Sequence, residues 1–230
     1  MNIVLTGYGK MGKVIEGILM KRNHNLLKTI DSEKELAEFP SSDAVCIDFT
    51  TPEAFKANYK TLADKFSSVV VGTTGWDDIK SEVIDYFKKN NTNLVYATNF
   101  SLGVNIFFEA VDFISGLISE HADYDPYVIE LHHKEKLDIP SGTAITTKKI
   151  IDKNIKKEKE TEISSVRTGF IKGIHEAGFE SEYDKISIRH EAYSREGFAL
   201  GAVIAAEWIA ETGGIWDFRE MLKSKIINKK

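Results

Sequence analysis

The amino-acid sequence predicts an α/β protein, in which a doubly wound parallel-sheet domain is followed by a second domain of the α+β class. Three observations lead to this prediction. Short apolar runs alternate with helix-like segments through the first hundred residues. The first run leads directly into a glycine-rich turn. After Asn99 this alternation stops, and a long helical segment is followed by strands of mixed polarity.

The composition narrows the class of protein. The chain has 230 residues, of which 42% are hydrophobic and 28% charged, which is typical of a soluble globular protein of one or two domains. A net charge of -5 argues against a nucleic-acid partner. No apolar stretch approaches the ~18 residues that a membrane span needs. The N-terminus enters a strand with no basic leader, so we expect a cytoplasmic protein. The single cysteine, Cys46, lies in the apolar run AVCIDF and predicts a buried, inert thiol.

The elements of the first domain follow from apolar runs and helix-start signals. Five runs are expected to form buried parallel strands, at residues 3–5, 26–30, 44–49, 69–71 and 94–97. Helices are expected from Met11, from Pro52 with Thr51 as its cap, and after Trp76-Asp77-Asp78. Together they predict a Rossmann-type, doubly wound domain that binds a dinucleotide.

The second domain begins with a helix predicted over residues 101–121. Its apolar side is expected to carry Val104, Phe107, Phe108, Val111, Phe113, Ile114 and Ile118. Strands are predicted at 127–132, 163–167 and 185–189, and helices from Ser141 to about Asn154 and at 201–210. The mixed Lys/Glu run at 153–160 reads as a solvated helix end or loop. We expect residues 1–100 and 201–230 to form the dinucleotide-binding domain, and residues 101–200 a substrate-binding and oligomerisation domain.

The glycine turn matches the pattern G-x-G-x-x-G. Its residues are Gly7, Tyr8, Gly9, Lys10, Met11 and Gly12. The first glycine permits the tight turn, the second lets pyrophosphate approach the backbone, and the third lets the helix pack closely. Asp31, nineteen residues after Gly12, is placed to accept hydrogen bonds from a ribose and favours NADH over NADPH. Lys28, Ser32 and Lys34 weaken that preference. The alternative is a tight turn with an incidental surface aspartate.

Two further loops follow predicted strands of the same domain. They are Gly72-Thr73-Thr74 and Ala97-Thr98-Asn99-Phe100. Because ligands of doubly wound sheets bind at the carboxyl ends of the strands, these small and polar residues suit the ribose and the nicotinamide carboxamide. The alternative for each loop is an ordinary βα turn.

The segment ELHHKEKLDIPSGTA, residues 130–144, is the most unusual part of the chain. His132 and His133 would face opposite sides of a strand unless the strand ends there. Lys136, four residues beyond His132, can fold back over the same site. Lys134 and Lys136 add positive charge that disfavours zinc, so no metal is expected. The segment therefore predicts anion binding, with histidine able to supply a proton near neutral pH.

The turn at residues 140–144 is expected to open a helix. The backbone amides of Gly142 and Thr143 would then face a carboxylate, and Ser141 or Thr143 would cap the helix or contact the ligand. Two histidines, a lysine and helix amides around one cavity indicate a substrate that carries carboxylates. The alternative is a polar hairpin loop before a capped helix.

These motifs together resemble the dihydrodipicolinate reductase (4-hydroxy-tetrahydrodipicolinate reductase) family over nearly the whole chain. The matching blocks are GYGKMG at 7–12, VGTTGW at 71–76, ATNFSLGVN at 97–105, the histidine segment, residues 165–169, residues 173–175, and IRHEAYSREGFALGA at 188–202. The histidine block is highly specific for the family, and the glycine turn is not. Two departures stand out: the glycine turn is one residue shorter than in many members, and Glu191 replaces a basic residue, which leaves the role of position 191 open.

The resemblance implies roles for the matching residues. His132 would be the catalytic acid with Lys136 as its partner, and His133, Gly142 and Thr143 would hold a substrate carboxylate. NADH or NADPH would reduce the unsaturated cyclic dicarboxylate to tetrahydrodipicolinate in the diaminopimelate route to lysine. A protonated histidine and a lysine would stabilise the charge that develops on hydride addition. The family also implies a homotetramer.

Two other functions remain open at this point. One is a two-domain NAD(P) oxidoreductase acting on a sugar or an amino-acid semialdehyde, which would not need the histidine segment. The other is a non-catalytic nucleotide sensor, which would not need a proton donor at His132.

Overall fold

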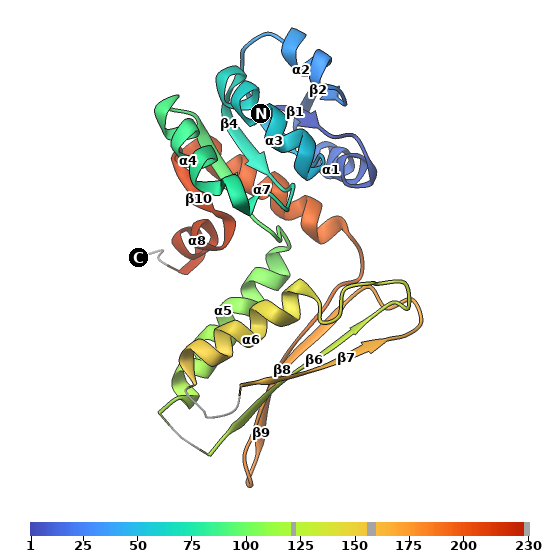
Figure 1. The fold of residues 1–230 in the computed structure, drawn as a ribbon, viewed down its shortest axis with the longest axis vertical. Helices are drawn as coiled ribbons and strands as arrows, with labels where there is room; N and C mark the ends of the chain where they lie inside the picture. Colours follow the sequence, from blue (N-terminus) through green and yellow to red (C-terminus); the bar gives the residue numbers. More distant parts are fainter. Residues whose placement is uncertain (121–122, 156–159, 228–230) are drawn as a thin grey trace. The chain divides into compact units, whose positions relative to one another are not determined.

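The computed structural model describes residues 1–120, 123–155 and 160–227. The chain forms two compact units, one of Met1–Leu102 with Arg195–Lys230 and the other of Gly103–Ser194. Each unit has its own sheet and helices (Figure 1). Residues 156–159 of the predicted Lys/Glu loop, and the last three residues of the chain, lie outside the described residues. None of the described helices is both long enough and apolar enough to cross a membrane.

The first unit is built on a parallel sheet with the strand order β10-β5-β4-β3-β1-β2. Its strands are β1 (Asn2–Thr6), β2 (Asn25–Ile30), β3 (Ser42–Asp48), β4 (Phe66–Val71), β5 (Asn93–Tyr96) and β10 (Ile215–Asp217). The five predicted strands and the Rossmann-type class are confirmed. The edge strand β10 was not predicted, because three residues give no periodicity to read.

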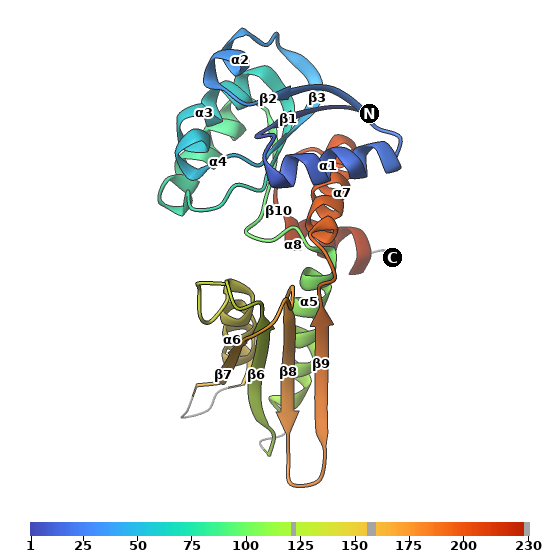
Figure 2. The ribbon, with the colours of Figure 1, turned by 90° about the vertical axis from the view of Figure 1, so that its right-hand side faces the viewer.

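Helices cover both faces of this sheet, which explains why its strands are apolar throughout (Figures 1 and 2). They are α1 (Lys10–Lys21), α2 (Glu33–Glu38), α3 (Pro52–Lys65), η1 (Asp77–Ile79), α4 (Lys80–Lys89), α7 (Glu196–Thr212), α8 (Phe218–Leu222) and η2 (Lys223–Ile227). Thr51 caps α3 as predicted, because its side chain accepts a hydrogen bond from the Ala54 amide. The short helix α2 was missed.

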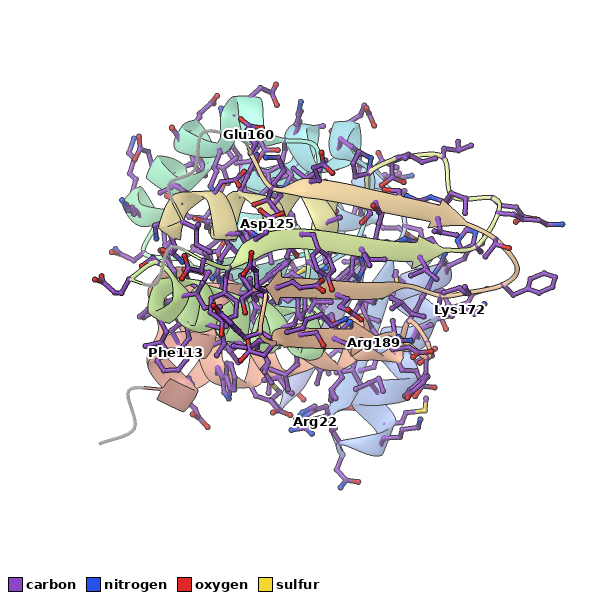
Figure 3. All side chains as sticks on the ribbon, turned by 90° about the horizontal axis from the view of Figure 1, so that it is seen from below. Arg22, Phe113, Asp125, Glu160, Lys172 and Arg189 are labelled. Carbon is purple, nitrogen blue, oxygen red and sulfur yellow. The ribbon has the colours of Figure 1, made fainter. Side chains whose placement is uncertain are left out.

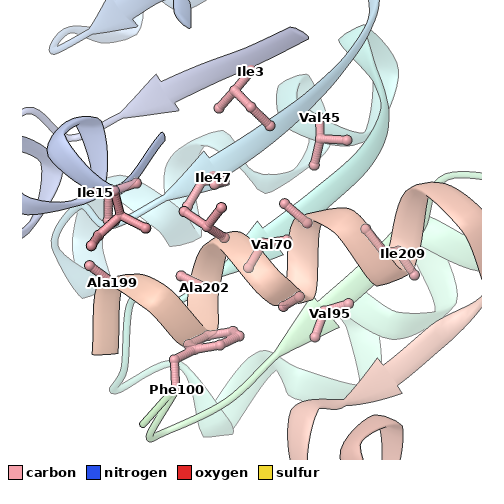
Figure 4. Packing of buried hydrophobic residues seen from close by; sticks show 14 of the residues in the cluster. Ile3, Ile15, Val45, Ile47, Val70, Val95, Phe100, Ala199, Ala202 and Ile209 are labelled. Atoms are coloured by element: carbon pink, nitrogen blue, oxygen red, sulfur yellow. The ribbon is translucent and has the colours of Figure 1, made fainter. Parts of the chain in front are cut away.

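The two faces of the sheet have separate cores. Ile3 and Leu5 of β1 face α1 and α7, whereas Val4 between them faces α3. Figure 4 shows the first of these cores, where Ala199 and Ala202 of α7 lie against the strands. Alanines allow this helix to approach closely. Cys46 is fully buried on the opposite face, and burial raises the pKa of its thiol, in agreement with the inert thiol predicted.

The second unit pairs a four-stranded mixed sheet with two helices, as expected for the α+β class. The sheet order is β7-β6-β8-β9, with β6 (Asp125–His132), β7 (Glu162–Arg167), β8 (Ile174–Glu180) and β9 (Lys185–Glu191). Helices α5 (Leu102–Ile118) and α6 (Gly142–Asn154) cover one face, and Figure 3 looks onto the other. The interior strand β8 was not predicted, since its residues, IHEAGFE, mix small and charged types.

One predicted core position of this unit is wrong. The side chain of Phe113 is 67% exposed, whereas Val104, Phe107, Phe108, Val111 and Ile118 are buried in the core between α5 and the sheet. Phe113 lies on the side of α5 that faces away from this core. The buried stripe of the helix is narrower than the number of hydrophobic residues in its sequence suggests.

Candidate active site

The glycine turn has the geometry that its pattern predicts. Gly7 has a φ of 86°, and a Cβ there would lie 2.3 Å from the carbonyl oxygen of Phe49. A Cβ on Gly12 would lie 2.4 Å from the carbonyl oxygen of Gly7. A Cβ on Gly9 would meet no atom within 4 Å. The turn therefore requires the first and third glycines, while the second leaves an open surface at the start of α1.

Asp31 lies beside this turn, at the end of β2. Its Oδ1 accepts a hydrogen bond of 2.5 Å from the backbone amide of Tyr8. The backbone amide of Asp31 in turn donates to Glu35 at 3.0 Å. The carboxylate is thus fixed next to the glycine turn, where a ribose-binding acid is needed. Tyr8 is held separately by a hydrogen bond from its hydroxyl to Glu16.

The two other predicted cofactor loops meet at one open pocket in the first unit. The pocket is lined by Thr73, Thr74, Gly75, Trp76, Asp77, Lys80, Tyr96, Ala97, Thr98 and Asp217. The structure therefore brings together Thr73, Thr74, Ala97 and Thr98, which the sequence places far apart. Trp76, Lys80 and Tyr96 belong to the lining but were not predicted.

The side chains of two predicted cofactor residues are turned into the protein. Phe100 is 2% exposed, and its ring lies 4.9 Å from that of Phe218. Thr73 is buried and donates its hydroxyl to Asp48 at 2.6 Å. Asn99 is half-buried, and its Oδ1 accepts a hydrogen bond from the Ser101 amide. Phe100 and Thr73 therefore shape this loop region from within.

A buried carboxylate that the sequence did not reveal joins three strand ends of this unit. Asp48 is 1% exposed and accepts hydroxyl hydrogen bonds from Thr6 at 2.7 Å, Thr73 at 2.6 Å and Thr50 at 3.1 Å. Burial raises the pKa of Asp48, although the three hydroxyls oppose the shift. The cluster holds the ends of β1, β3 and β4 in register at the edge where ligands of such sheets bind.

The second unit places its polar residues on the side of the sheet that packs against the helices. Glu130 in β6 is completely buried. Its Oε1 accepts hydrogen bonds from the Ser141 amide at 3.0 Å, the Ser165 hydroxyl at 2.7 Å and the Arg167 guanidinium at 2.7 Å. Burial acts to raise the pKa of Glu130, but the hydrogen bonds from Ser141, Arg167 and Ser165 outweigh it and lower that pKa to about 2.

His132 shares this face with Glu130, two residues along the same strand. It is 6% exposed, and its Nδ1 lies 3.1 Å from Oε2 of Glu130. A Cβ on Gly173 would lie 3.1 Å from its Nε2, so the missing side chain leaves that nitrogen uncovered. Burial lowers the pKa of His132, Glu130 opposes this, and Lys136 adds to it. The lowered pKa favours the neutral imidazole at pH 7.

His133 follows the last residue of β6 and is half-buried. Lys136 lies in the loop beyond β6, and its Nζ makes an ion pair with Asp138 at 2.7 Å. The ion pair with Lys136 lowers the pKa of Asp138. Lys136 is thus close enough to His132 to influence it, but in this state it is bound to a carboxylate of the chain.

The turn before α6 gives the three predicted contact residues different environments. Ser141 is 3% exposed, caps α6 through the Ala144 amide at 3.3 Å, and lies 3.1 Å from Nε2 of His175. Ser141 therefore takes the capping role that was expected of it or of Thr143, and its contact with substrate stays a prediction. Gly142 is exposed and Thr143 half-buried at the first turn of the helix, where backbone amides favour anions.

Three important neighbours were missed because strand register cannot be read from one sequence. Arg167 is paired with His132, and His175 with Glu130, across adjacent strands. Burial, with the nearby His132, lowers the pKa of His175 to about 4. Glu130 could have been found from the two-residue period, which places it on the same face as His132.

Glu130, His132 and His175 also bring potential metal-ligating atoms within 4.8 Å of one another. The guanidinium of Arg167 already occupies the carboxylate, and Lys136 adds a second positive charge nearby. Because a cation would meet both charges, we interpret the cluster as an acid–base site.

The chain is similar to known proteins over nearly its whole length. The family models "dihydrodipicolinate reductase, N-terminus" and "dihydrodipicolinate reductase, C-terminus" match residues 1–100 and 103–222. The 4-hydroxy-tetrahydrodipicolinate reductase of Christiangramia forsetii is 40% identical, over 99% of this chain and 100% of its own. That of Thermosipho africanus is 34% identical, over 95% of this chain and 96% of its own.

Solved structures share the fold. The dipicolinate-bound dihydrodipicolinate reductase from Paenisporosarcina sp. TG-14 has a TM-score of 0.78 at 23% identity, covering 96% of this chain and 98% of that one. The WlbA dehydrogenase from Chromobacterium violaceum, in complex with NADH and UDP-GlcNAcA, has a TM-score of 0.60 at 12% identity, covering 97% and 90%. With the two family models and the full-length relatives, the chain belongs to the dihydrodipicolinate reductase family, the oxidoreductases of the diaminopimelate route to lysine.

Proposed function

We propose that this protein uses NADH or NADPH to reduce the dihydrodipicolinate-type cyclic unsaturated dicarboxylate to tetrahydrodipicolinate, with His132 as proton donor and Lys136 assisting. The observation that carries the proposal is the environment of His132. It is a buried imidazole whose Nε2 is uncovered beside Gly173, with Lys136 and Arg167 close enough to influence its charge. Such a site suits a dianionic substrate that must receive a proton.

The first unit supports a nicotinamide cofactor. The open backbone at Gly9 and the start of α1 suit pyrophosphate, and Asp31 suits a ribose. The pocket lined by Thr74, Ala97 and Thr98 would take the nicotinamide end. A carboxylate at the ribose favours NADH, because it repels the additional phosphate of NADPH. When bound, the cofactor supplies the hydride, and the substrate gains that hydride together with one proton.

The chain's own residues would supply the proton. The carboxylates of an arriving dianion add negative charge near His132, which favours its protonated form and reverses the effect of burial. Lys136 would exchange Asp138 for the substrate and stabilise the developing anion. The imidazolium would then release its proton from Nε2, on the side that Gly173 leaves open, and return to the neutral form. His133, Gly142 and Thr143 would hold a substrate carboxylate.

We also propose that the protein is a cytoplasmic homotetramer. The helix-free face of the second sheet (Figure 3) supports an oligomer interface, since Val166 of β7, which is paired with Leu131 on this side of the sheet, is 41% exposed. Light scattering of the purified protein would measure the assembly, and a monomer at micromolar concentration would refute it.

The test is an assay coupled to the upstream synthase, run with NADH and with NADPH in turn. His132→Gln should fold and bind cofactor but lose about 10²–10⁴-fold in turnover, the usual effect of removing a general acid. Wild-type protein that oxidises neither cofactor would reject the reaction. A His132→Gln enzyme with normal turnover would reject the role of His132.

A further inference from the structure

The buried face of β6 holds a carboxylate oxygen and a ring nitrogen that make no hydrogen bond to any other described atom. They are Oε2 of Glu130 and Nδ1 of His132. The two atoms are 3.1 Å apart, and both side chains are nearly inaccessible to solvent. This contact becomes an ion pair when His132 is protonated, and the orientation of the ring does not meet hydrogen-bond geometry. Buried polar atoms without partners are costly, so their juxtaposition calls for a reason.

The other oxygen of Glu130 makes clear that the carboxylate is fixed. Oε1 receives hydrogen bonds from α6 through the Ser141 amide and from β7 through Ser165 and Arg167. Three donors on one oxygen hold the group in its ionised form and direct Oε2 toward the histidine. Glu130 is therefore a negative charge placed against one nitrogen of His132, while Gly173 leaves the other nitrogen uncovered.

We propose that Glu130 is the positioning residue of the proton donor: its carboxylate places a negative charge against Nδ1 of His132 and stabilises the imidazolium from which Nε2 gives its proton. The proposal rests on the proposed role of His132 and extends it. It assigns to Glu130 a task beyond joining α6 to β7. A carboxylate behind an imidazole sets which nitrogen carries the hydrogen and makes the charged form more favourable.

All charged and titratable groups around His132 have to be considered together. Glu130 on the same strand and Asp138 in the following loop favour the charged imidazole. Lys136 in that loop and Arg167 on β7 disfavour it.

From β8, His175 lies with its ring centre 5.0 Å from that of His132. Beyond it, His190 on β9 is paired with His175, and burial lowers the pKa of His190. Both histidines are thus largely neutral, so Glu130 is the nearest fixed negative charge to His132.

The experiment is an NMR titration of the imidazoles in the full-length protein. The protein has six histidines, so the signal of His132 is identified by its loss in His132→Gln. Glu130→Gln keeps an acceptor for Ser141, Ser165 and Arg167 but removes the charge. It should lower the titration midpoint of His132 by about 1–3 pH units, the usual effect of an adjacent charge. The descending limb of the kcat–pH profile should move in the same direction.

Two matched variants test the direction in which the titration midpoint of His132 shifts. Ser165→Ala removes one hydrogen bond to the same oxygen without changing charge, and it should leave the midpoint nearly unchanged. Arg167→Gln removes the opposing positive charge, and it should raise the midpoint. If Glu130→Gln does not fold, Glu130→Asp, which retracts the charge by one methylene group, should give a smaller shift to lower pH.

The outcomes separate this inference from the proposed function. A folded Glu130→Gln protein with the wild-type midpoint, or a Glu130→Asp protein with a raised one, would overturn the role of Glu130. If His132→Gln is inactive in that case, the proposed function still stands. If His132→Gln keeps full turnover, the proposed function fails whatever the titration shows.

Discussion

The glycine turn allows the effects of fold and cofactor binding to be separated by three substitutions of glycine by alanine. An added Cβ atom would have different neighbours at each of the three positions. A Cβ at Gly12 would lie 2.4 Å from a backbone oxygen, whereas a Cβ at Gly9 or at Gly17 would meet nothing within 4 Å. Gly12 and Gly17 both lie within α1, and Gly9 is its N-cap. Gly17→Ala is therefore the matched control for Gly12→Ala in the same helix.

The expected free energies of unfolding follow from these distances. Gly17→Ala should stabilise the protein by about 0.5–1 kcal/mol, because alanine loses less conformational entropy in a helix. Gly12→Ala receives the same gain, but the overlap forces the backbone to move, at a cost of about 1–3 kcal/mol. Its stability should thus fall about 1–3 kcal/mol below that of Gly17→Ala. Gly9→Ala should keep near wild-type stability and lose cofactor affinity, because its methyl group projects into the open surface.

Urea unfolding measures the stabilities, and titration calorimetry with NADH measures the affinities. Gly17→Ala should bind NADH as the wild type does. The reasoning is refuted if Gly12→Ala is as stable as Gly17→Ala, or if Gly9→Ala binds NADH with unchanged affinity.

Three further predictions concern the second unit. Gly173→Ala would place a methyl group 3.1 Å from Nε2 of His132. Turnover in the coupled assay should therefore fall while the affinity for NADH is retained. Full turnover would show that Nε2 does not face the substrate. Glu130 has a folded pKa of about 2 against an ordinary 4.5, so its ionised form contributes on the order of 3 kcal/mol. Because the folded pKa is depressed, this stability is present above about pH 4.5 and is lost as pH falls toward 2. Urea midpoints between pH 3 and 7 should consequently fall less steeply in Glu130→Gln than in wild type, and parallel curves would contradict this. Phe113→Ala should change stability by less than about 0.5 kcal/mol, whereas Phe107→Ala should cost about 3–5 kcal/mol in urea unfolding; equal losses would show that Phe113 is covered.

Sequence reasoning succeeded where a feature depends on local chemistry. Gly7 and Gly12 were interpretable because each is required by its own backbone surroundings. The apolar strands were found because helices cover both faces of the sheet, which removes the polar alternation. Thr51 before Pro52 predicted the start of α3 for the same local reason.

What the sequence did not reveal depends on pairing between distant segments. Glu130, Arg167 and His175 form one site only because β6 pairs with β7 and β8 in a particular register. Asp48 lies inside an apolar run, and its hydroxyl partners come from other strand ends. Ser141 was expected to cap α6 or contact the ligand, because a capping serine and a ligand-binding serine look alike in sequence; the structure shows that it caps the helix.

The position of α7 has a consequence for how the polypeptide is made. Ala199, Ala202 and Ile209 complete the core formed by the first strands, yet all of the second unit emerges from the ribosome before them. Until then, the face of the nascent sheet that carries Ile3 and Val70 lacks its main cover. The inserted unit can fold as soon as it is synthesised, whereas the first strands must wait until α7 has been made, and this is the interval in which a chaperone would be needed most.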